Sequence, residues 1–229
     1  PKETPITAPV VREILGPDAE SVALAWRFPG AADKDVETLQ VVSQILYNGQ
    51  AGLIDLDLTQ QQKTLSAYCY PMTMSDYSAF MMQGRPKQGQ TLDEVKDLLL
   101  GELKKLREGD FDEKMLEANI NNFKLYQMQQ LENNDARADM FVESFVNGSD
   151  WADEVTALDR MSKLTKDDIV AFANKYLKDD NYAVIYKKQG KDPNEKKMSK
   201  PEITPIVMNR DTVSTFLKEI QASVVTPIE

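Results

Sequence analysis

Three pairs of neighbouring carboxylate residues in this sequence are candidates for acid–base catalysis. They are Asp110/Asp112, Asp153/Glu154 and Asp167/Asp168, and each pair could supply one proton donor and one acceptor. Each pair also lies where a helix is expected to begin. A carboxylate at such a position binds the free backbone N–H groups and meets the positive end of the helix dipole. We therefore interpret all three pairs as helix caps.

Histidine is absent from all 229 residues. Its absence removes the commonest general base, the Ser-His and Cys-His nucleophile pairs and the usual imidazole ligands of zinc. The single cysteine, Cys69, stands between Tyr68 and Tyr70, and no local acid or base would activate it. A zinc site built from one cysteine plus carboxylates would be unusual. We predict that Cys69 is a packing residue and that no metal is bound by this chain.

The segment Gly84–Thr91 has the glycine spacing of a phosphate-binding loop between a predicted strand and a predicted helix. The lysine that would contact the phosphates is replaced by Gln90, and Pro86 removes one of the backbone N–H donors. The segment is therefore predicted to be a connection into a capped helix.

The composition limits the partners and the compartment only in part. A net charge of −10 argues against binding to nucleic acid or to anionic membranes. The one basic stretch, Lys187 to Lys200, is interrupted by glycine, proline and acidic residues, and we expect a solvated loop there. The sequence contains no run of about 18 apolar residues, so no membrane-spanning helix is predicted. It also contains no recognisable signal peptide. The compartment stays open.

The elements that must position these groups follow from periodicity. Apolar residues alternate from Ser21 to Phe28, which predicts a half-buried strand, and Val10 to Leu15 is its predicted partner across a turn at Gly16-Pro17. A helix capped by Asp33 is predicted to run to Asn48-Gly49. A short helical piece is expected around 53–58.

The rest of the chain predicts a hairpin, several helices and a closing strand. The hairpin comprises Leu65–Tyr70 and Tyr77–Gln83. The predicted helices cover about 91–109, 112–132, 135–146, 150–161 and 165–177; the last strand covers 181–188, and a short amphipathic helix carries Val213, Phe216-Leu217 and Ile220. Because strands and helices are segregated, the expected fold class is α+β, an antiparallel sheet backed by helices on one face. The expected organisation is a linker over 1–9, one domain over 10–190, and a linker with a short helix over 191–229.

Methionine and aromatic side chains are concentrated on the predicted hairpin. The set is Met72, Met74, Met81 and Met82 with Tyr68, Tyr70, Tyr77 and Phe80. Packing in the core is the expected role of these residues. The alternative is that part of the surface receives a peptide or a neighbouring domain.

The order of these pieces resembles a known family. The strand ending in Phe28-Pro29-Gly30, the helix closed by Asn48-Gly49, the run Gln60-Gln61-Gln62 and the strand Leu65-Ser66-Ala67-Tyr68 are similar to one domain of the M16 zinc metallopeptidases (pitrilysin, insulinase and mitochondrial processing peptidase type). The resemblance covers residues 10–190. It implies a LuxS/metallohydrolase-like fold, present in tandem domains that close around an unfolded peptide.

The resemblance also implies where site residues belong. The inverted zinc motif His-x-x-Glu-His would lie on the helix at 35–48, where this chain has Glu37 but no histidine. Zinc is therefore expected in a catalytic domain elsewhere in the parent protein. The family's substrate-holding Arg–Tyr pair falls on Gln61 and Tyr68, so only the tyrosine is present. These two residues are the candidate substrate-binding residues.

Three hypotheses remain open from the sequence. The first is a non-catalytic domain of a zinc metalloendopeptidase that supports an adjacent zinc-bearing M16 domain of the same protein and forms part of the chamber for a peptide substrate. The second is a peptidase-like assembly module without a proteolytic role. The third is an independent enzyme that uses carboxylates only, which the absence of histidine and the capping interpretation both disfavour.

Overall fold

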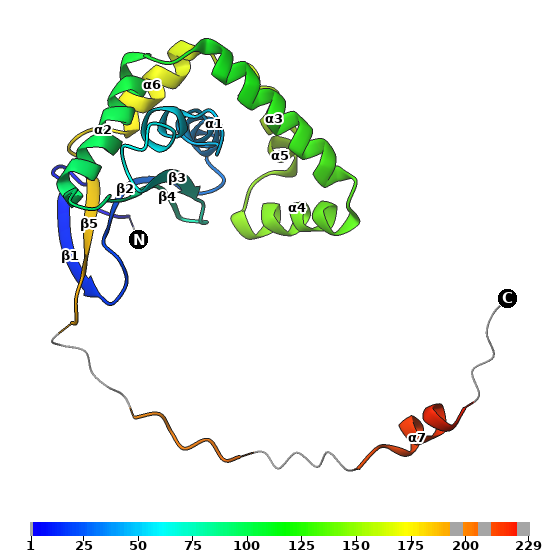
Figure 1. Ribbon diagram of the computed structural model, residues 1–229. Helices are drawn as coiled ribbons and strands as arrows, with labels where there is room; N and C mark the ends of the chain where they lie inside the picture. The colour runs from blue at the N-terminus through cyan, green and yellow to red at the C-terminus, as the bar shows by residue number, and fades with distance from the viewer. Residues whose placement is uncertain (1, 193–198, 206–211, 224–229) are drawn as a thin grey trace. The chain divides into compact units, whose positions relative to one another are not determined.

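The computed structural model describes residues 2–192, 199–205 and 212–223. Contacts within the chain divide it into a first unit through residue 193 and a second unit that holds the rest. The first unit contains a five-stranded sheet and six α-helices among its described residues (Figure 1). Of the helices in the described ranges, none is long and apolar enough to cross a membrane.

The sheet has the strand order β1-β5-β2-β4-β3. These strands are β1 (Val10–Gly16), β5 (Tyr182–Gln189), β2 (Ser21–Pro29), β4 (Tyr77–Arg85) and β3 (Ser66–Met72). Neighbours pair antiparallel except β1 and β5, which are parallel. The α+β class is confirmed, and the sheet is mixed because of that one pair.

The predicted pairing of residues 10–15 with residues 21–28 is wrong. Strand β5 lies between them, paired with β1 on one side and with β2 on the other. Tyr182 and Val184 are buried in β5, whereas β1 buries no residue, so the more apolar distant strand occupies the central position. The loop after β1 is held to β5 instead, through Gly190 N–H to the Gly16 carbonyl at 2.9 Å and Gln189 Nε2 to the Pro17 carbonyl at 3.1 Å.

One face of the sheet forms the core. Val22, Leu24, Trp26 and Phe28 alternate along β2 and are fully or almost fully buried. They meet α1 (Asp35–Leu46), α2 (Leu92–Glu108) and α6 (Lys166–Tyr176), the helices that lie over this face in Figure 1. The Trp26 indole N–H donates to the Lys178 carbonyl at 3.1 Å, which satisfies the one polar atom of that side chain.

Local capping sets the helix boundaries close to those predicted. Thr91 and Thr165 form capping boxes with Glu94 and Asp168, and Gly109 ends α2 in the left-handed region at φ 72°. The remaining helices of this unit are α3 (Glu113–Leu131), α4 (Asn134–Asn147) and α5 (Trp151–Met161), and a π-helical turn η1 covers Asp55–Thr59. Helix α3 runs from the α1 layer out to α4 (Figure 1).

The second unit contains α7 (Thr215–Ala222), with Ser214 as its cap. This confirms the amphipathic helix predicted there. The loop predicted over the basic stretch is wrong at its start, because Lys187 and Lys188 lie in β5; Lys188 pairs with Glu13 at 3.0 Å. Residues 193–198 of that stretch lie outside the described residues.

Candidate functional site

The hairpin of β3 and β4 presents two faces. Ala67, Cys69, Phe80 and Met82 point into the core and are buried. Tyr68, Tyr70, Met81 and Gln83 point to the opposite face and are half-buried. The methionine and aromatic cluster of the sequence is therefore divided by strand alternation, since successive side chains of a strand face opposite ways. Met72 and Met74, near the hairpin tip, are about half exposed.

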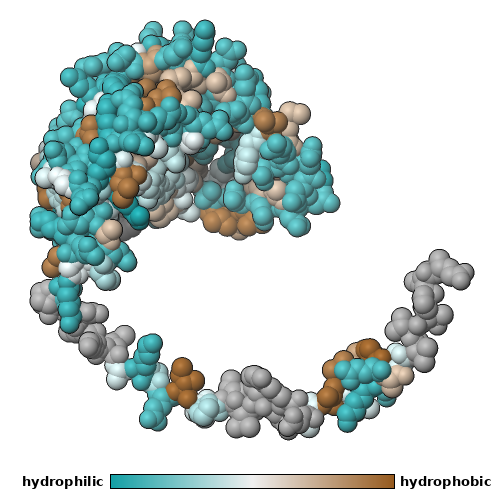
Figure 2. Space-filling view, viewed as in Figure 1, coloured by the Kyte–Doolittle hydropathy of each residue, from teal (hydrophilic) through white to brown (hydrophobic). Residues whose placement is uncertain are grey.

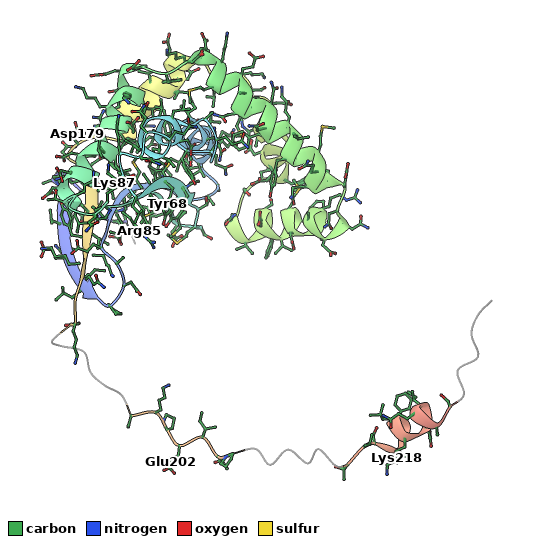
Figure 3. All side chains as sticks on the ribbon, viewed as in Figure 1. Tyr68, Arg85, Lys87, Asp179, Glu202 and Lys218 are labelled. Carbon is green, nitrogen blue, oxygen red and sulfur yellow. The ribbon has the colours of Figure 1, made fainter. Side chains whose placement is uncertain are left out.

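Tyr68 lies at the centre of an aromatic strip on this outer face. Its hydroxyl donates to Gln83 Oε1, the residue opposite it in the β3–β4 register. Its ring stacks on Tyr70 at a centroid distance of 6.1 Å and lies 6.3 Å from Tyr47, at the end of α1. Figure 3 labels Tyr68 in this hairpin and Arg85 at the end of β4. Tyr47, Tyr68 and Tyr70 are called the tyrosine strip below.

Small side chains lie beside the tyrosine strip. In the register of β4 and β2, Gln83 is opposite Ala23 and Met81 is opposite Ala25. Cross-strand partners share a face, so alanines continue this face from the tyrosines towards the sheet centre. Tyrosines and alanines therefore share the face that α1, α2 and α6 do not cover. At the Arg27–Tyr77 end of this face, the Tyr77 hydroxyl accepts from the Glu3 N–H at 2.9 Å and Arg27 donates to the Thr4 carbonyl at 3.0 Å.

Strand β3 is an edge strand of the sheet. Within the described ranges only β4 pairs with it, so its second edge carries backbone groups without a strand partner. Pro71 has no N–H to donate, and proline is tolerated in a sheet at such an edge. An edge of this kind can accept an extended peptide as an additional strand.

Gln61 and Tyr68 bind different partners. Its Nε2 donates to Asp57 Oδ1 at 3.3 Å, and Asp57 Oδ2 accepts from Lys105 Nζ at 2.7 Å. Lys105 also binds Glu102 Oε1 at 3.0 Å. Burial raises the pKa of the Glu102 carboxyl, and the Lys105 ammonium opposes that effect. Gln61 therefore extends a structural chain of polar groups on η1 and α2, while Tyr68 binds Gln83.

A carboxylate fixes the loop that leads to Gln61. Asp55 Oδ2 accepts hydrogen bonds from the backbone N–H groups of Asn48, Gly49 and Gly52, at 3.0, 3.1 and 2.9 Å. Asp55 is buried, and these donors compensate the cost of removing it from water. The contact ties the end of α1 to η1, and so fixes the relative position of Tyr47 and Gln61.

The residues of α1 do not fit a zinc site. Glu37 is bound by the guanidinium of Arg160, with Nε to Oε2 at 3.0 Å, and α1 contains no histidine or cysteine. Across residues 2–192, 199–205 and 212–223, no three side chains of the ligand types converge to hold a metal ion. Cys69 is fully buried with its Sγ near the Ser43 carbonyl, and burial raises the pKa of its thiol.

The other candidate motifs have structural partners. Asp112 accepts from the Lys114 N–H at 2.9 Å and Asp168 belongs to the α6 capping box, as predicted. The interpretation of Asp153/Glu154 as a helix cap is wrong, because the cap of α5 is Asp150, which accepts from the Ala152 N–H at 2.8 Å. Asp153 and Glu154 lie in the first turn of α5, and Asp153 pairs with Lys34 at 3.2 Å. In the segment 84–91, Gln90 occupies the position of the lysine that a phosphate-binding loop would have. Its Nε2 donates to the Lys63 carbonyl at 3.0 Å, so this side chain joins two loops of the chain.

Sequence reasoning from single motifs missed Tyr47 and Gln83. Gln83 follows from the hairpin register, because counting back from the turn places it opposite Tyr68. No sequence pattern predicts the contact of Tyr47 with Tyr68, because it depends on where the end of α1 lies relative to β3.

Comparisons with a family model and with a curated protein both relate this chain to zinc proteases of the M16 type. The family model described as "Peptidase M16 inactive domain" matches residues 1–123, more than half of the 229 residues. The zinc protease PqqE of Helicobacter pylori is 24% identical over 174 residues, which are 76% of this chain and 39% of that protein.

Two solved structures share the fold. A protease from Helicobacter pylori superposes with a TM-score of 0.76 at 22% identity, covering 82% of this chain and 46% of that one. A peptidase M16 inactive domain from Pseudomonas fluorescens gives a TM-score of 0.70 at 15% identity, covering 80% and 44%. The chain thus spans less than half the length of these similar proteins.

Proposed function

Because the chain belongs to the family of peptidase M16 inactive domains, we propose that it is the non-catalytic partner of a zinc-bearing domain in the same protein. In that role it forms one wall of a peptide-binding chamber and supports the neighbouring domain. The zinc ion, held by the neighbouring domain, supplies the hydrolytic chemistry. This chain supplies binding and orientation of the substrate.

The observation that carries the proposal is the tyrosine strip beside the unpaired edge of β3. An extended peptide that adds to β3 pairs its main-chain N–H and C=O groups with those of the edge, independent of sequence. Its alternate side chains then lie on the face of Tyr68 and Tyr70. Main-chain pairing with a broad aromatic surface suits unfolded peptides of varied sequence.

The remaining groups of the site assist binding only. Gln61 and Asp57 are hydrogen-bonded to each other. Asp112 and Asp168 cap helices, and Asp153 forms an ion pair with Lys34. Without histidine, none of these groups has a partner that would activate water at neutral pH.

A test of this proposal combines the chain with the zinc-bearing domain encoded by the same gene and follows cleavage of a quenched fluorescent peptide. Adding the chain is expected to raise cleavage. Tyr68→Ala should lower kcat/KM about tenfold, mainly through KM, because it removes uniform binding. Tyr68→Phe keeps the ring and loses only the hydroxyl donor to Gln83, so it should stay within about threefold of wild type.

The matched control is Tyr126→Ala, an exposed tyrosine on α3 outside the hairpin, which should leave cleavage unchanged. Equal losses for Tyr68→Ala and Tyr126→Ala would contradict the proposed site. If the two domains bind each other and cleavage does not respond to this chain, the assembly-module hypothesis replaces the chamber hypothesis.

A further inference from the structure

Helix α4 is folded without burying an apolar face. Ser144 is its only buried residue, whereas Phe141, Val142, Phe145 and Val146 are more than half exposed, Phe145 by 86%. On the opposite side of the helix, Met140, Glu143 and Asn147 line a cleft of about 660 Å³ between α4 and α1. Helix α4 therefore directs its apolar residues away from the domain. Figure 2 shows hydrophobic atoms along the outer side of this helix.

The exposed surface continues onto α5. The Trp151 ring stacks on Phe141 at a centroid distance of 4.2 Å, and Val155, four residues further along the same helix face, is half exposed. We call this set the α4–α5 apolar surface. Its members are Phe141, Val142, Phe145, Val146, Trp151 and Val155.

Capping contacts define the ends of α4, and the tip of the β3–β4 hairpin contacts it through Ser75 Oγ, which donates to the Val146 carbonyl at 3.5 Å. The Asn133 side chain accepts from the Asp135 N–H at 2.8 Å, and Gly148 ends the helix in the left-handed region at φ 68°. Ser144 Oγ donates to the Ser149 carbonyl at 3.0 Å. A helix that is defined by its caps and presents large apolar side chains to water has the character of an interaction site.

Charge around the surface restricts what can cover it. Residues 134–161 contain seven acidic residues and two arginines. Three of the acidic residues, Glu143, Asp153 and Glu154, line the cleft, and Arg160 is bound to Glu37. The acidic border of the surface therefore consists of Asp135, Asp139, Asp150 and Asp159, against the single cation Arg137. A second copy of the chain would bring two acidic borders together, and an anionic lipid surface would be repelled in the same way. A protein surface with lysine or arginine around an apolar centre would be attracted.

We propose that the α4–α5 apolar surface docks a partner protein through an apolar segment flanked by basic residues. Phe145 and the Phe141–Trp151 pair form its centre, since large aromatic side chains dominate such contacts. The acidic border selects the partner and speeds encounter. This site is separate from the tyrosine strip and does not depend on the proposed peptide chamber.

The test uses two designed amphipathic helices as probes, identical on their leucine face and flanked either by lysine or by glutamate. The chain has two tryptophans, and Trp26 is fully buried, so a change in emission on titration reports on Trp151. The lysine-flanked helix is expected to bind at least ten times more tightly than the glutamate-flanked helix, and its affinity should fall as salt is added.

Phe145→Glu should weaken binding of the lysine-flanked helix at least tenfold. Its matched control is Phe216→Glu on α7, a phenylalanine of similar exposure, which should have no effect. Titrations of the wild-type chain are sufficient to overturn the proposal, if both helices bind equally well or neither binds. Sedimentation that shows a dimer abolished by Phe145→Glu would also overturn it, in favour of self-association.

Discussion

Gln61 and Tyr68 lie seven residues apart, and the fold gives them unrelated neighbours. Gln61 is hydrogen-bonded to Asp57 on η1, while Tyr68 faces the outer side of the sheet and donates to Gln83. A turn with a positive φ of 51° at Gln62 separates the two residues. Tyr68 is thus the residue that we propose for peptide contact, whereas the Gln61 side chain belongs to the polar chain that ends at Glu102.

Gly84 is required by a close approach of α2 to β4. A Cβ at this position would lie 2.4 Å from Val95 Cγ1, which is well inside van der Waals contact. We predict that Gly84→Ala destabilises the protein by about 1–3 kcal/mol through overpacking. Gly101→Ala, in the middle of α2 with open space around it, should stabilise by about 0.5–1 kcal/mol. Urea unfolding measures both, and similar free energies for the two variants would contradict the packing argument.

The Glu102 carboxyl predicts a pH dependence of stability. Burial raises its native pKa above the ordinary 4.5, so the native state holds this proton more tightly than the unfolded chain. Its contribution to stability is fully present below about pH 4.5 and is lost as the pH rises through the native pKa. Glu102→Gln stays neutral throughout. The stability of this variant relative to wild type should therefore increase as the pH rises above about 4.5, measured by urea unfolding at a series of pH values.

A constant difference between Glu102→Gln and wild type would refute this account. A difference that changes in the opposite direction would show that the ion pair with Lys105 outweighs the cost of burial.

At the scale of the elements, local capping signals determine where the helices begin and end. The pairing partners of the strands instead depend on competition between segments for positions in the sheet. The ends of α2 and α6 follow from residues at their own boundaries, as the two capping boxes and Gly109 show. Strand β1 instead pairs with a segment about 170 positions away in the sequence. Its turn residues at 16–18 predicted a local hairpin, which β5 displaced because Tyr182 and Val184 bury apolar surface that β1 lacks.

The position of β1 predicts its dynamics. It is an edge strand with no buried residue, whereas β2 is central and fully packed on one side. We expect the amides of residues 10–16 to exchange with deuterium at least ten times faster than those of residues 21–29, because local opening of β1 exposes little apolar surface. Hydrogen-exchange mass spectrometry measures both segments. Equal protection would indicate that β1 unfolds only together with the core.

At the scale of the molecule, the two proposed interaction surfaces differ in chemistry. The hairpin face combines an unpaired strand edge with tyrosines, which suits main-chain recognition of extended peptides. The α4–α5 apolar surface combines a helix face with an acidic border, which suits a folded partner. The net charge of −10 acts on the second surface more directly, so salt should weaken docking there more than peptide binding at β3.

The amino-acid sequence by itself determined the helix boundaries, the α+β class, the membership of the M16 group and the lack of a histidine-based zinc site. Caps, alternation and residue counts are read along the chain and need no neighbours in space, and the M16 relationship rested on a resemblance in the order of the segments, which the family model bears out. Only the tertiary structure decided that β5 enters between β1 and β2, that Tyr68 meets Gln83 and Tyr47, and that α4 leaves its apolar face uncovered. These features depend on which segments, distant in the sequence, gain the most free energy by burying apolar surface against one another. That balance is decided only when the whole chain packs together.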